Sequence, residues 1–389
     1  MSHNFKILQI IPELQTGGAE QTTLDIGQAL VSREWASYVA SAGGRMVDRL
    51  TSGGSHHIEL PLNSKNPYTI WRNAGRLAKI IKDEKIDLIH ARSRAPAWSS
   101  LIAARQTNIP FVTTYHGAYN ENSKLKALYN SVMARADQII ANSHWTADLI
   151  RNRNPWAKDK ITVIHRGTDF DSFVAGSIAP ERLATLRQNW NITPDDQIVL
   201  HLARITGWKG QNVVIDAAAR IAKDFPAVKF VLAGDAQGRE EYLAGLKKQI
   251  QTHGLEDTVL LPGHCSDPAA AMAIANIVVV ASIEAEAFGR AAVEAGALEK
   301  PVIVTRIGAV GETVLAVPDV PPTQRTGWKV EPGSSTDLAS ALCDVMTMDE
   351  AERIGVGKRA RLHGKEAFSL EQMCSKTIAV YENLLLKNL

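Results

Sequence analysis

Residues 276–306 read NIVVVASIEAEAFGRAAVEAGALEKPVIVTR, and the stretch changes pattern twice. Its ends, NIVVVAS (276–282) and KPVIVTR (300–306), are short runs rich in Ile and Val that predict buried strands. Between them, GRAAVEAGALEK predicts a helix that follows the loop IEAEAF (283–288). Two strands joined through a helix form the βαβ unit of a parallel sheet. The stretch therefore predicts an α/β fold.

The same alternation runs through all 389 residues, a length that exceeds one ordinary core and indicates two domains. TIWRNAGRLAKIIKDEK (69–85) has helical spacing, with apolar residues at Ile70, Ala74, Leu77 and Ile81. The predicted strands are 5–11, 86–90, 109–115, 137–143 and 160–165 in the first half, and 197–203, 228–234, 258–263, 276–282 and 300–306 in the second. We predict two doubly wound (Rossmann-like) parallel-sheet domains that face each other across a cleft.

The domain boundary is predicted where GTDFDSFVAGSIAPERL (167–183) interrupts the alternation with Gly, Ser and Pro. This places the first domain at residues 1–170, a linker or hinge at 171–195 and the second domain at 196–369.

Composition excludes several classes of protein. Apolar residues make up 45% and charged residues 22%, which is typical of a soluble globular protein. Cys265, Cys343 and Cys374 lie far apart without a CxxC motif, so neither a disulfide framework nor a zinc site is expected, and a reducing compartment is favoured. No signal peptide and no run of about 18 apolar residues is recognised, so a cytoplasmic protein is predicted.

Charge is distributed unevenly along the chain. Residues 1–170 hold 21 Lys and Arg against 14 Asp and Glu, a balance of +7, and the remainder holds 22 against 27, a balance of −5. A basic first domain indicates an anionic partner for that domain alone. The alternative is scattered surface charge with no target.

Loops that follow strands are the places to look for a ligand, because open parallel sheets bind ligands beyond the carboxyl ends of their strands. Gly17 and Gly18 lie between a strand and a helix, where exposed amides favour an anion; the alternative is a tight turn without a ligand. The pattern is not a GxGxxG fingerprint. His116 directly follows a strand and is a candidate for the cleft, although a lone histidine is commonly structural.

Arg204 and Lys209 lie five residues apart in LARITGWKG (202–210), around a turn before a helix. An arginine fork and a lysine point charge can bind a diphosphate together. The alternative is a pair of solvated cations.

Glu286 and Glu294 lie eight positions apart, on either side of a predicted helix N-terminus. The amides of Phe288, Gly289, Arg290 and Ala291 would form the first turn and favour phosphate. A carboxylate repels phosphate but accepts hydrogen bonds from hydroxyl groups, so one glutamate suits a sugar and the other a ribose. Together with Arg204 and Lys209, this arrangement describes a nucleotide-sugar.

At this point the sequence resembles a known family. SIEAEAFGRAAVE (282–294) resembles the E-x7-E motif of the retaining GT-B glycosyltransferases, particularly glycosyltransferase family 4. The resemblance spans nearly the whole chain through motifs in the same order, namely Gly17-Gly18, HGAY (116–119), IIANS (139–143), VIHRGTDFDSF (163–173), LARITGWKG (202–210) and EKPVIVTRIGAVGE (299–312). Three positions depart from the family pattern: Ala203 replaces a glycine, Glu299-Lys300 replaces a small residue, and Gly308-Ala309 replaces a glycine pair.

The resemblance implies a role for each candidate. Glu294 would bind the ribose, Glu286 the transferred sugar, and Arg204 and Lys209 the departing diphosphate. His116 would contact the sugar, and Gly17 and Gly18 would approach the donor phosphate or the acceptor. We expect the base near Gly263 and His264. The resemblance also implies a metal-independent reaction without a cofactor, so Asp169 and Asp171 receive no metal-binding role.

The implied activity is a retaining transfer of a sugar, usually a hexose, from a nucleotide-diphosphate donor to an acceptor hydroxyl. The implied acceptor is a glycan or a lipid-linked envelope glycan, such as a lipopolysaccharide core, bound by the first domain at the inner face of a membrane. The basic first domain would dock peripherally on anionic lipid, and no nucleic-acid partner is expected. By the same analogy, helix 370–389 packs back on the first domain. Two alternatives remain, a nucleotide-sugar epimerase or hydrolase on this scaffold and a non-catalytic nucleotide-binding protein.

Overall fold

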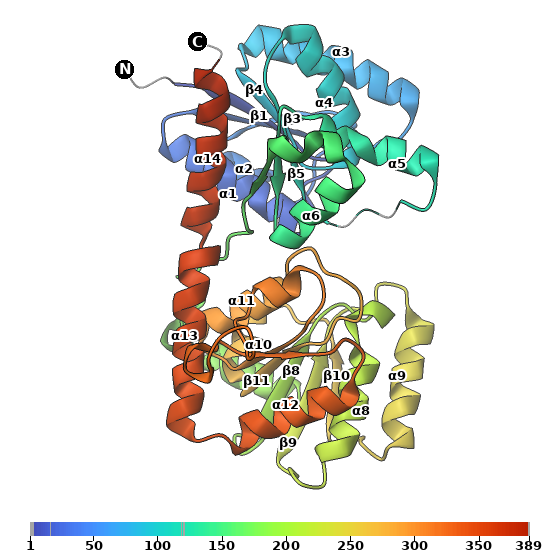
Figure 1. Cartoon of the computed structure of the whole chain (residues 1–389), viewed down its shortest axis with the longest axis vertical. Helices are drawn as coiled ribbons and strands as arrows, with labels where there is room; N and C mark the ends of the chain where they lie inside the picture. The colour runs from blue at the N-terminus through green and yellow to red at the C-terminus, as the bar shows by residue number, and fades with distance from the viewer. Residues whose placement is uncertain (1–3, 16, 118, 120, 388–389) are drawn as a thin grey trace. The chain divides into compact units, whose positions relative to one another are not determined.

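A computed structural model describes residues 4–15, 17–117, 119 and 121–387. The chain forms two compact units (Figure 1). Unit 1 comprises Met1–Gly167 together with Leu370–Leu389, and unit 2 comprises Thr168–Ser369. Each unit contains one parallel sheet covered by helices, so the predicted fold class, two Rossmann-like domains, is confirmed.

Unit 1 has a seven-stranded parallel sheet in the order β3-β2-β1-β4-β5-β6-β7. Its strands are β1 (Lys6–Ile10), β2 (Ala36–Ser41), β3 (His56–Glu59), β4 (Leu88–Ala91), β5 (Phe111–Tyr115), β6 (Gln138–Ala141) and β7 (Ile161–Val163). Its helices are α1 (Gly18–Ser32), α2 (Val47–Ser52), α3 (Pro67–Glu84), α4 (Arg94–Thr107), α5 (Lys124–Asn130), α6 (His144–Arg153) and α14 (Leu370–Leu386). The order reverses at β1, so the carboxyl ends of β1 and β4 lie at a switch point where ligands commonly bind.

Local sequence explains which strands of unit 1 were predictable. β4 and β5 are buried along their whole length, and their sequences, LIHA and FVTTY, consist largely of apolar and β-branched residues. β2 and β3 were not predicted: β2 contains Ala and Ser residues, and β3 at the sheet edge, HHIE, is partly exposed. α3 was predicted, and it begins where the Asn66 side chain accepts hydrogen bonds from the backbone N–H groups of Tyr68 and Thr69.

Helix α14 belongs to unit 1, as the resemblance implied for residues 370–389, of which 388–389 lie outside the described part. Its apolar face packs with Ile26 and Leu30 of α1 in one buried cluster. The Tyr381 side chain is fully buried, and its hydroxyl lies 2.5 Å from Nδ1 of His90 on β4. The last helix of the chain therefore completes the core of the first unit.

Unit 2 has a six-stranded parallel sheet in the order β10-β9-β8-β11-β12-β13. Its strands are β8 (Gln197–Leu202), β9 (Val228–Ala233), β10 (Val259–Gly263), β11 (Ile277–Val280), β12 (Val302–Thr305) and β13 (Trp328–Val330). Its helices are α7 (Pro180–Asn189), α8 (Gln211–Ile221), α9 (Glu240–Thr252), α10 (Pro268–Ile274), α11 (Arg290–Ala297), α12 (Ser335–Thr347) and α13 (Glu350–Phe368). β13 is a three-residue strand at the sheet edge and was not predicted.

The predicted linker at 171–195 is wrong. The predicted end of the first domain at 170 and the predicted start of the second domain at 196 are therefore wrong as well. The structure divides after Gly167, and the segment that follows is packed into unit 2. Ile178, Trp190 and Ile192 are buried in the core of that unit, and Arg182 of α7 pairs with Asp267 at 2.7 Å. The Gly, Ser and Pro residues bend the chain here, but the apolar residues among them anchor it.

Candidate functional site

The loops after β8 and β11 meet at a glycine. Gly210 precedes α8 with a φ of 75°, and a Cβ there would lie 2.0 Å from the carbonyl oxygen of Ala281, which follows β11. The Ile283 N–H donates to the carbonyl of Trp208 over 2.8 Å and joins the same two loops. This close approach, which a side chain would prevent, brings the short helical turn Gly207–Lys209 against the loop that carries Glu286.

Lys209 and Glu286 form an ion pair, with 2.7 Å between Nζ and Oε1. The two side chains are 14% and 13% exposed, so the pair is largely withdrawn from water. The Ser282 hydroxyl donates a short hydrogen bond to the same oxygen. Burial lowers the pKa of Lys209, and the neighbouring Glu286 opposes this effect. Arg204, whose charge also lowers that pKa, is exposed. Within the described residues, its guanidinium has no polar side-chain partner.

The backbone of Glu286 is held by the loop after β12. The Ala309 N–H donates to the Glu286 carbonyl over 2.8 Å. Gly308 has a φ of 60°, and a Cβ there would lie 2.7 Å from the Glu286 backbone. Gly308-Ala309 therefore retains the one glycine that this contact needs.

Glu294 is buried at 7% exposure on α11, where Arg290 binds it through Nε and Nη2 at 3.1 and 2.6 Å. Both contacts are to Oε1. Gly289 precedes the helix with a φ of 99°, and Ala291 is partly buried against the core. The Phe288 side chain is buried against Phe368, so a ligand could meet the backbone of Phe288 but not its ring.

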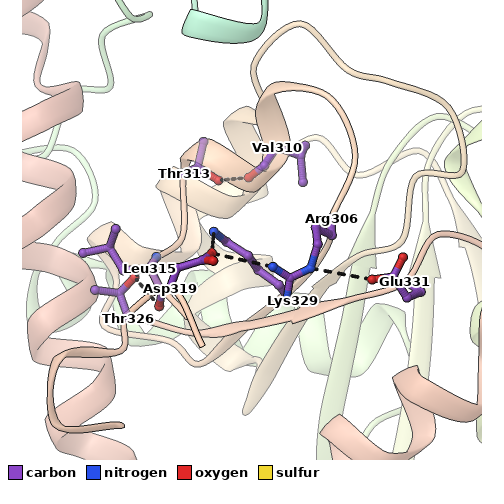
Figure 2. Close-up of polar contacts among 8 residues, drawn as sticks. All are labelled: Arg306, Val310, Thr313, Leu315, Asp319, Thr326, Lys329 and Glu331. Carbon is purple, nitrogen blue, oxygen red and sulfur yellow. Dashed lines mark hydrogen bonds and ion pairs between the residues drawn. The ribbon is translucent and has the colours of Figure 1, made fainter. Parts of the chain in front are cut away.

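A third cation at this edge of the sheet is already neutralised. Figure 2 shows Arg306, which follows β12, with Nη1 3.6 Å from Asp319 and Nε 3.6 Å from Glu331. Lys329 also binds Asp319, at 2.9 Å. Arg306 is therefore held by carboxylates, whereas Arg204 is available for an anion.

Gly263 and His264 line a cavity of about 250 Å³ at the end of β10, together with Ile205, Gly234 and Leu261. Gly234 packs so closely on the backbone of the loop after β8 that a Cβ would lie 1.8 Å from the Ala203 carbonyl oxygen. The cavity thus adjoins the loop that carries Arg204.

His116, Gly17 and Gly18 lie in unit 1. His116 lines a cavity of about 330 Å³ that also includes Ala19 and Glu20 in the first turn of α1. Gly17 precedes α1 with a φ of 150°. Ala118 of the HGAY motif lies outside the described residues. Asp169 accepts hydrogen bonds from the Asp171 and Ser172 N–H groups, so it shapes a turn.

Sequence reasoning missed Ser282 and Arg92. Ser282 lies two residues beyond the end of β11 and four residues before Glu286, and Arg92 directly follows the buried strand β4 and lines the His116 cavity. In both cases the available signal was a polar residue at the carboxyl end of a buried strand. The described residues contain no group of three or more His, Cys, Asp or Glu side chains placed to bind a metal ion.

Comparisons with known proteins agree across the chain. Residues 16–172 match the family described as Glycosyltransferase Family 4, and residues 184–362 match Glycosyl transferases group 1. A glycosyltransferase from Rickettsia africae ESF-5 is 33% identical with a TM-score of 0.88, covering 99% of this chain and 100% of that one. HepE of Anabaena, solved with UDP and glucose, is 25% identical with a TM-score of 0.80, covering 98% and 100%. The N-acetyl-alpha-D-glucosaminyl L-malate synthase of Bacillus anthracis is 26% identical over 80% of this chain and 78% of its own.

Proposed function

Because this chain belongs to the GT-B glycosyltransferases, we propose that it transfers a sugar from a nucleotide-diphosphate donor to an acceptor hydroxyl with retention of anomeric configuration. The buried ion pair between Lys209 and Glu286 carries this proposal. It holds a cation for the diphosphate and a carboxylate for sugar hydroxyls within 2.7 Å of each other. The N-terminus of α11, which begins four residues after Glu286, adds backbone donors for phosphate.

In this reaction the bond between the anomeric carbon and the diphosphate breaks, and a bond from that carbon to the acceptor oxygen forms. The nucleoside diphosphate leaves with the bonding electron pair, and the hydroxyl proton of the acceptor passes to the departing diphosphate or to solvent. Lys209 and Arg204 stabilise the negative charge that develops on the leaving group. Glu286 binds hydroxyls of the transferred sugar, and Glu294 accepts from the ribose through the oxygen that Arg290 leaves free.

We propose that no divalent metal is required, because Arg204, the N-terminus of α11 and Lys209, which the diphosphate shares with Glu286, stabilise the diphosphate together. Turnover that is unchanged in excess EDTA supports this. Activity that is lost in EDTA and restored by Mg²⁺ or Mn²⁺ overturns it.

The donor can be identified by thermal shift, since a bound ligand stabilises the folded state in proportion to its occupancy. UDP, GDP and ADP and their glucose and N-acetylglucosamine conjugates form the panel, with UDP-glucose first, given the HepE complex. Stabilisation by one conjugate that is lost in Lys209→Gln supports a donor site here. A shift that Lys209→Gln leaves unchanged contradicts it. Free sugar or an epimer released without an acceptor would instead indicate a hydrolase or epimerase.

We further propose that unit 1 binds an acceptor at an anionic membrane surface on the cytoplasmic side, such as a lipid-linked envelope glycan. One face of α3 supports this, because Tyr68 and Trp71 are 65% and 67% exposed beside exposed Arg72, Lys79 and Lys82. Aromatic rings at the headgroup level and cations near anionic lipid are the usual features of a peripheral contact. No helix in the described ranges is long and apolar enough to cross a bilayer.

Co-sedimentation with phosphatidylglycerol vesicles tests this surface. We expect binding at low salt that weakens at high salt and is reduced in Trp71→Ala, with phosphatidylcholine vesicles as the control. Equal recovery with both lipids, or none with either, would contradict the membrane contact without affecting donor binding.

A further inference from the structure

Arg92 is a buried cation in unit 1 that none of the proposed donor contacts uses. It follows β4 and is 2% exposed. Its Nε and Nη2 donate to Oε1 of Gln9 at 2.9 and 2.7 Å, and the Tyr381 side chain lies near enough to affect the pKa of Arg92. Neither of these side chains is charged. In the described ranges Arg92 forms no ion pair, and the attraction of Asp25 is smaller than the effect of burial on its pKa.

An uncompensated buried charge costs several kcal/mol. Buried charged groups that line a cavity are common at functional sites. Arg92 lines the cavity of about 330 Å³ that His116 also lines. This volume matches that of small-molecule sites. The cavity lies beyond the carboxyl ends of β1 and β4, at the switch point of the sheet.

His116 presents a donor in the same cavity. Nη2 of Arg166 lies 3.3 Å from Nδ1 of His116. Because an arginine can only donate a hydrogen bond, Nδ1 is the acceptor, and the proton of the neutral ring lies on Nε2. Burial and the nearby Arg166 and Arg92 lower the pKa of His116 well below its usual value, which keeps the ring neutral. Its Nε2 is buried and has no hydrogen-bond partner in the part of the chain that the structure describes.

The remaining polar groups of the cavity fit a hydroxylated ligand. Ser93 lines it at the start of α4, yet its side chain does not cap that helix, so its hydroxyl and the first-turn amides are available. Glu13 and Glu20 also line it, and a carboxylate accepts from hydroxyl groups. Glu13 already accepts from Asn63 at 2.7 Å.

We propose that this cavity binds the acceptor through an anionic group, a phosphate or a carboxylate, held by the guanidinium N–H groups of Arg92 that do not bond Gln9, together with Ser93 and Nε2 of His116. Glu13 and Glu20 bind hydroxyls of the same molecule. The proposal rests on the proposed function, since it identifies the acceptor class of that transferase as hydroxylated anions.

The test measures binding of inorganic phosphate and of malonate to the full chain by calorimetry, because these two probes distinguish the two kinds of anion. Lys209→Gln combined with Arg204→Gln removes both donor-site cations, so the anion affinity that survives in this double variant is assigned to unit 1. In that background, Arg92→Lys and Ser93→Ala should each weaken the better-bound anion. The first should do so by about tenfold or more, since a single lysine ammonium cannot bond Gln9 and an anion in the fixed planar geometry of a guanidinium. Arg49→Gln, an exposed arginine of unit 1, is the matched control and should have no effect.

Far-UV circular dichroism and thermal unfolding establish that each variant is folded. Loss of anion binding in Arg92→Lys and retention in Arg49→Gln support the site. Anion binding that is abolished by the double variant of Lys209 and Arg204 alone, or that is equal in Arg92→Lys and Arg49→Gln, overturns it. The nucleotide-sugar panel is measured on the wild-type chain, so a chain that binds its donor but no anion in unit 1 refutes this inference and leaves the proposed function intact.

Discussion

Replacing Glu286 with Gln separates the two roles assigned to the buried ion pair. The substitution keeps the shape of the side chain but leaves Lys209 without its carboxylate. It also removes the interaction that raises the pKa of Lys209, so burial lowers that pKa further. We expect a less stable unit 2, tighter binding of nucleoside diphosphate and much slower sugar transfer.

The magnitude follows from the geometry. At 2.7 Å the Coulomb attraction is roughly 6 kcal/mol at an effective dielectric constant of 20, and the desolvation of both ions opposes most of it. With 14% and 13% exposure, the pair is nearer to buried pairs, whose disruption costs about 3–5 kcal/mol, than to surface pairs at about 0–1 kcal/mol. We expect Glu286→Gln to cost about 2–3 kcal/mol. The double variant with Lys209→Met should cost less than the sum of the two single changes.

Denaturant unfolding of the wild type, both single variants and the double variant gives the coupling energy. Titration with UDP, GDP or ADP should show affinity about threefold to tenfold higher in Glu286→Gln, because the diphosphate no longer competes with a carboxylate for Lys209. Transfer should fall by about a hundredfold or more, since the contact to the sugar is lost. A coupling energy below about 0.5 kcal/mol, together with weaker nucleotide binding, would refute this reasoning.

Three further changes probe the surrounding site. Gly210→Ala should destabilise unit 2 by more than about 2 kcal/mol in denaturant unfolding. The new Cβ would lie 2.0 Å from the Ala281 carbonyl oxygen, and the residue would have to keep a left-handed backbone conformation. An unchanged denaturant concentration at the unfolding midpoint would contradict this close approach. Burial lowers the pKa of His201 from 6.5 to about 4. Between pH 6.5 and pH 4 the unfolded chain therefore binds more protons than the folded chain, and the wild type loses stability as the pH falls through this range. His201→Asn should reduce that loss, and equal pH profiles for the two proteins would contradict it. Glu294→Gln removes the charge that pairs with Arg290, whose side chain is 47% exposed, so the free energy of unfolding should change by only about 1 kcal/mol. Because Glu294 is proposed to bind the ribose, the affinity for ribonucleotides should fall about tenfold. The affinity for 2′-deoxyribonucleotides should change less.

The sequence by itself determined the fold class and the order of the candidate loops. β11, IVVV, is a continuous apolar run. The fully buried strands β4 and β5, LIHA and FVTTY, are apolar or β-branched except for His90 and Tyr115, so a local pattern is sufficient to recognise all three. β2 and β3 escaped recognition because their identity as strands comes from pairing with β1 and with each other rather than from an apolar run.

The tertiary structure decided the partners of the charged groups. Nothing local joins Lys209 to Glu286: the pair forms because Gly210 allows the loop after β8 to touch Ala281. The burial of Arg92 likewise depends on α14, which returns from the far end of the chain to place Tyr381 beside it. The sequence does not show whether a carboxylate or a guanidinium is solvated or buried in the folded protein. Its chemistry is set by desolvation and by neighbours that arrive through the fold.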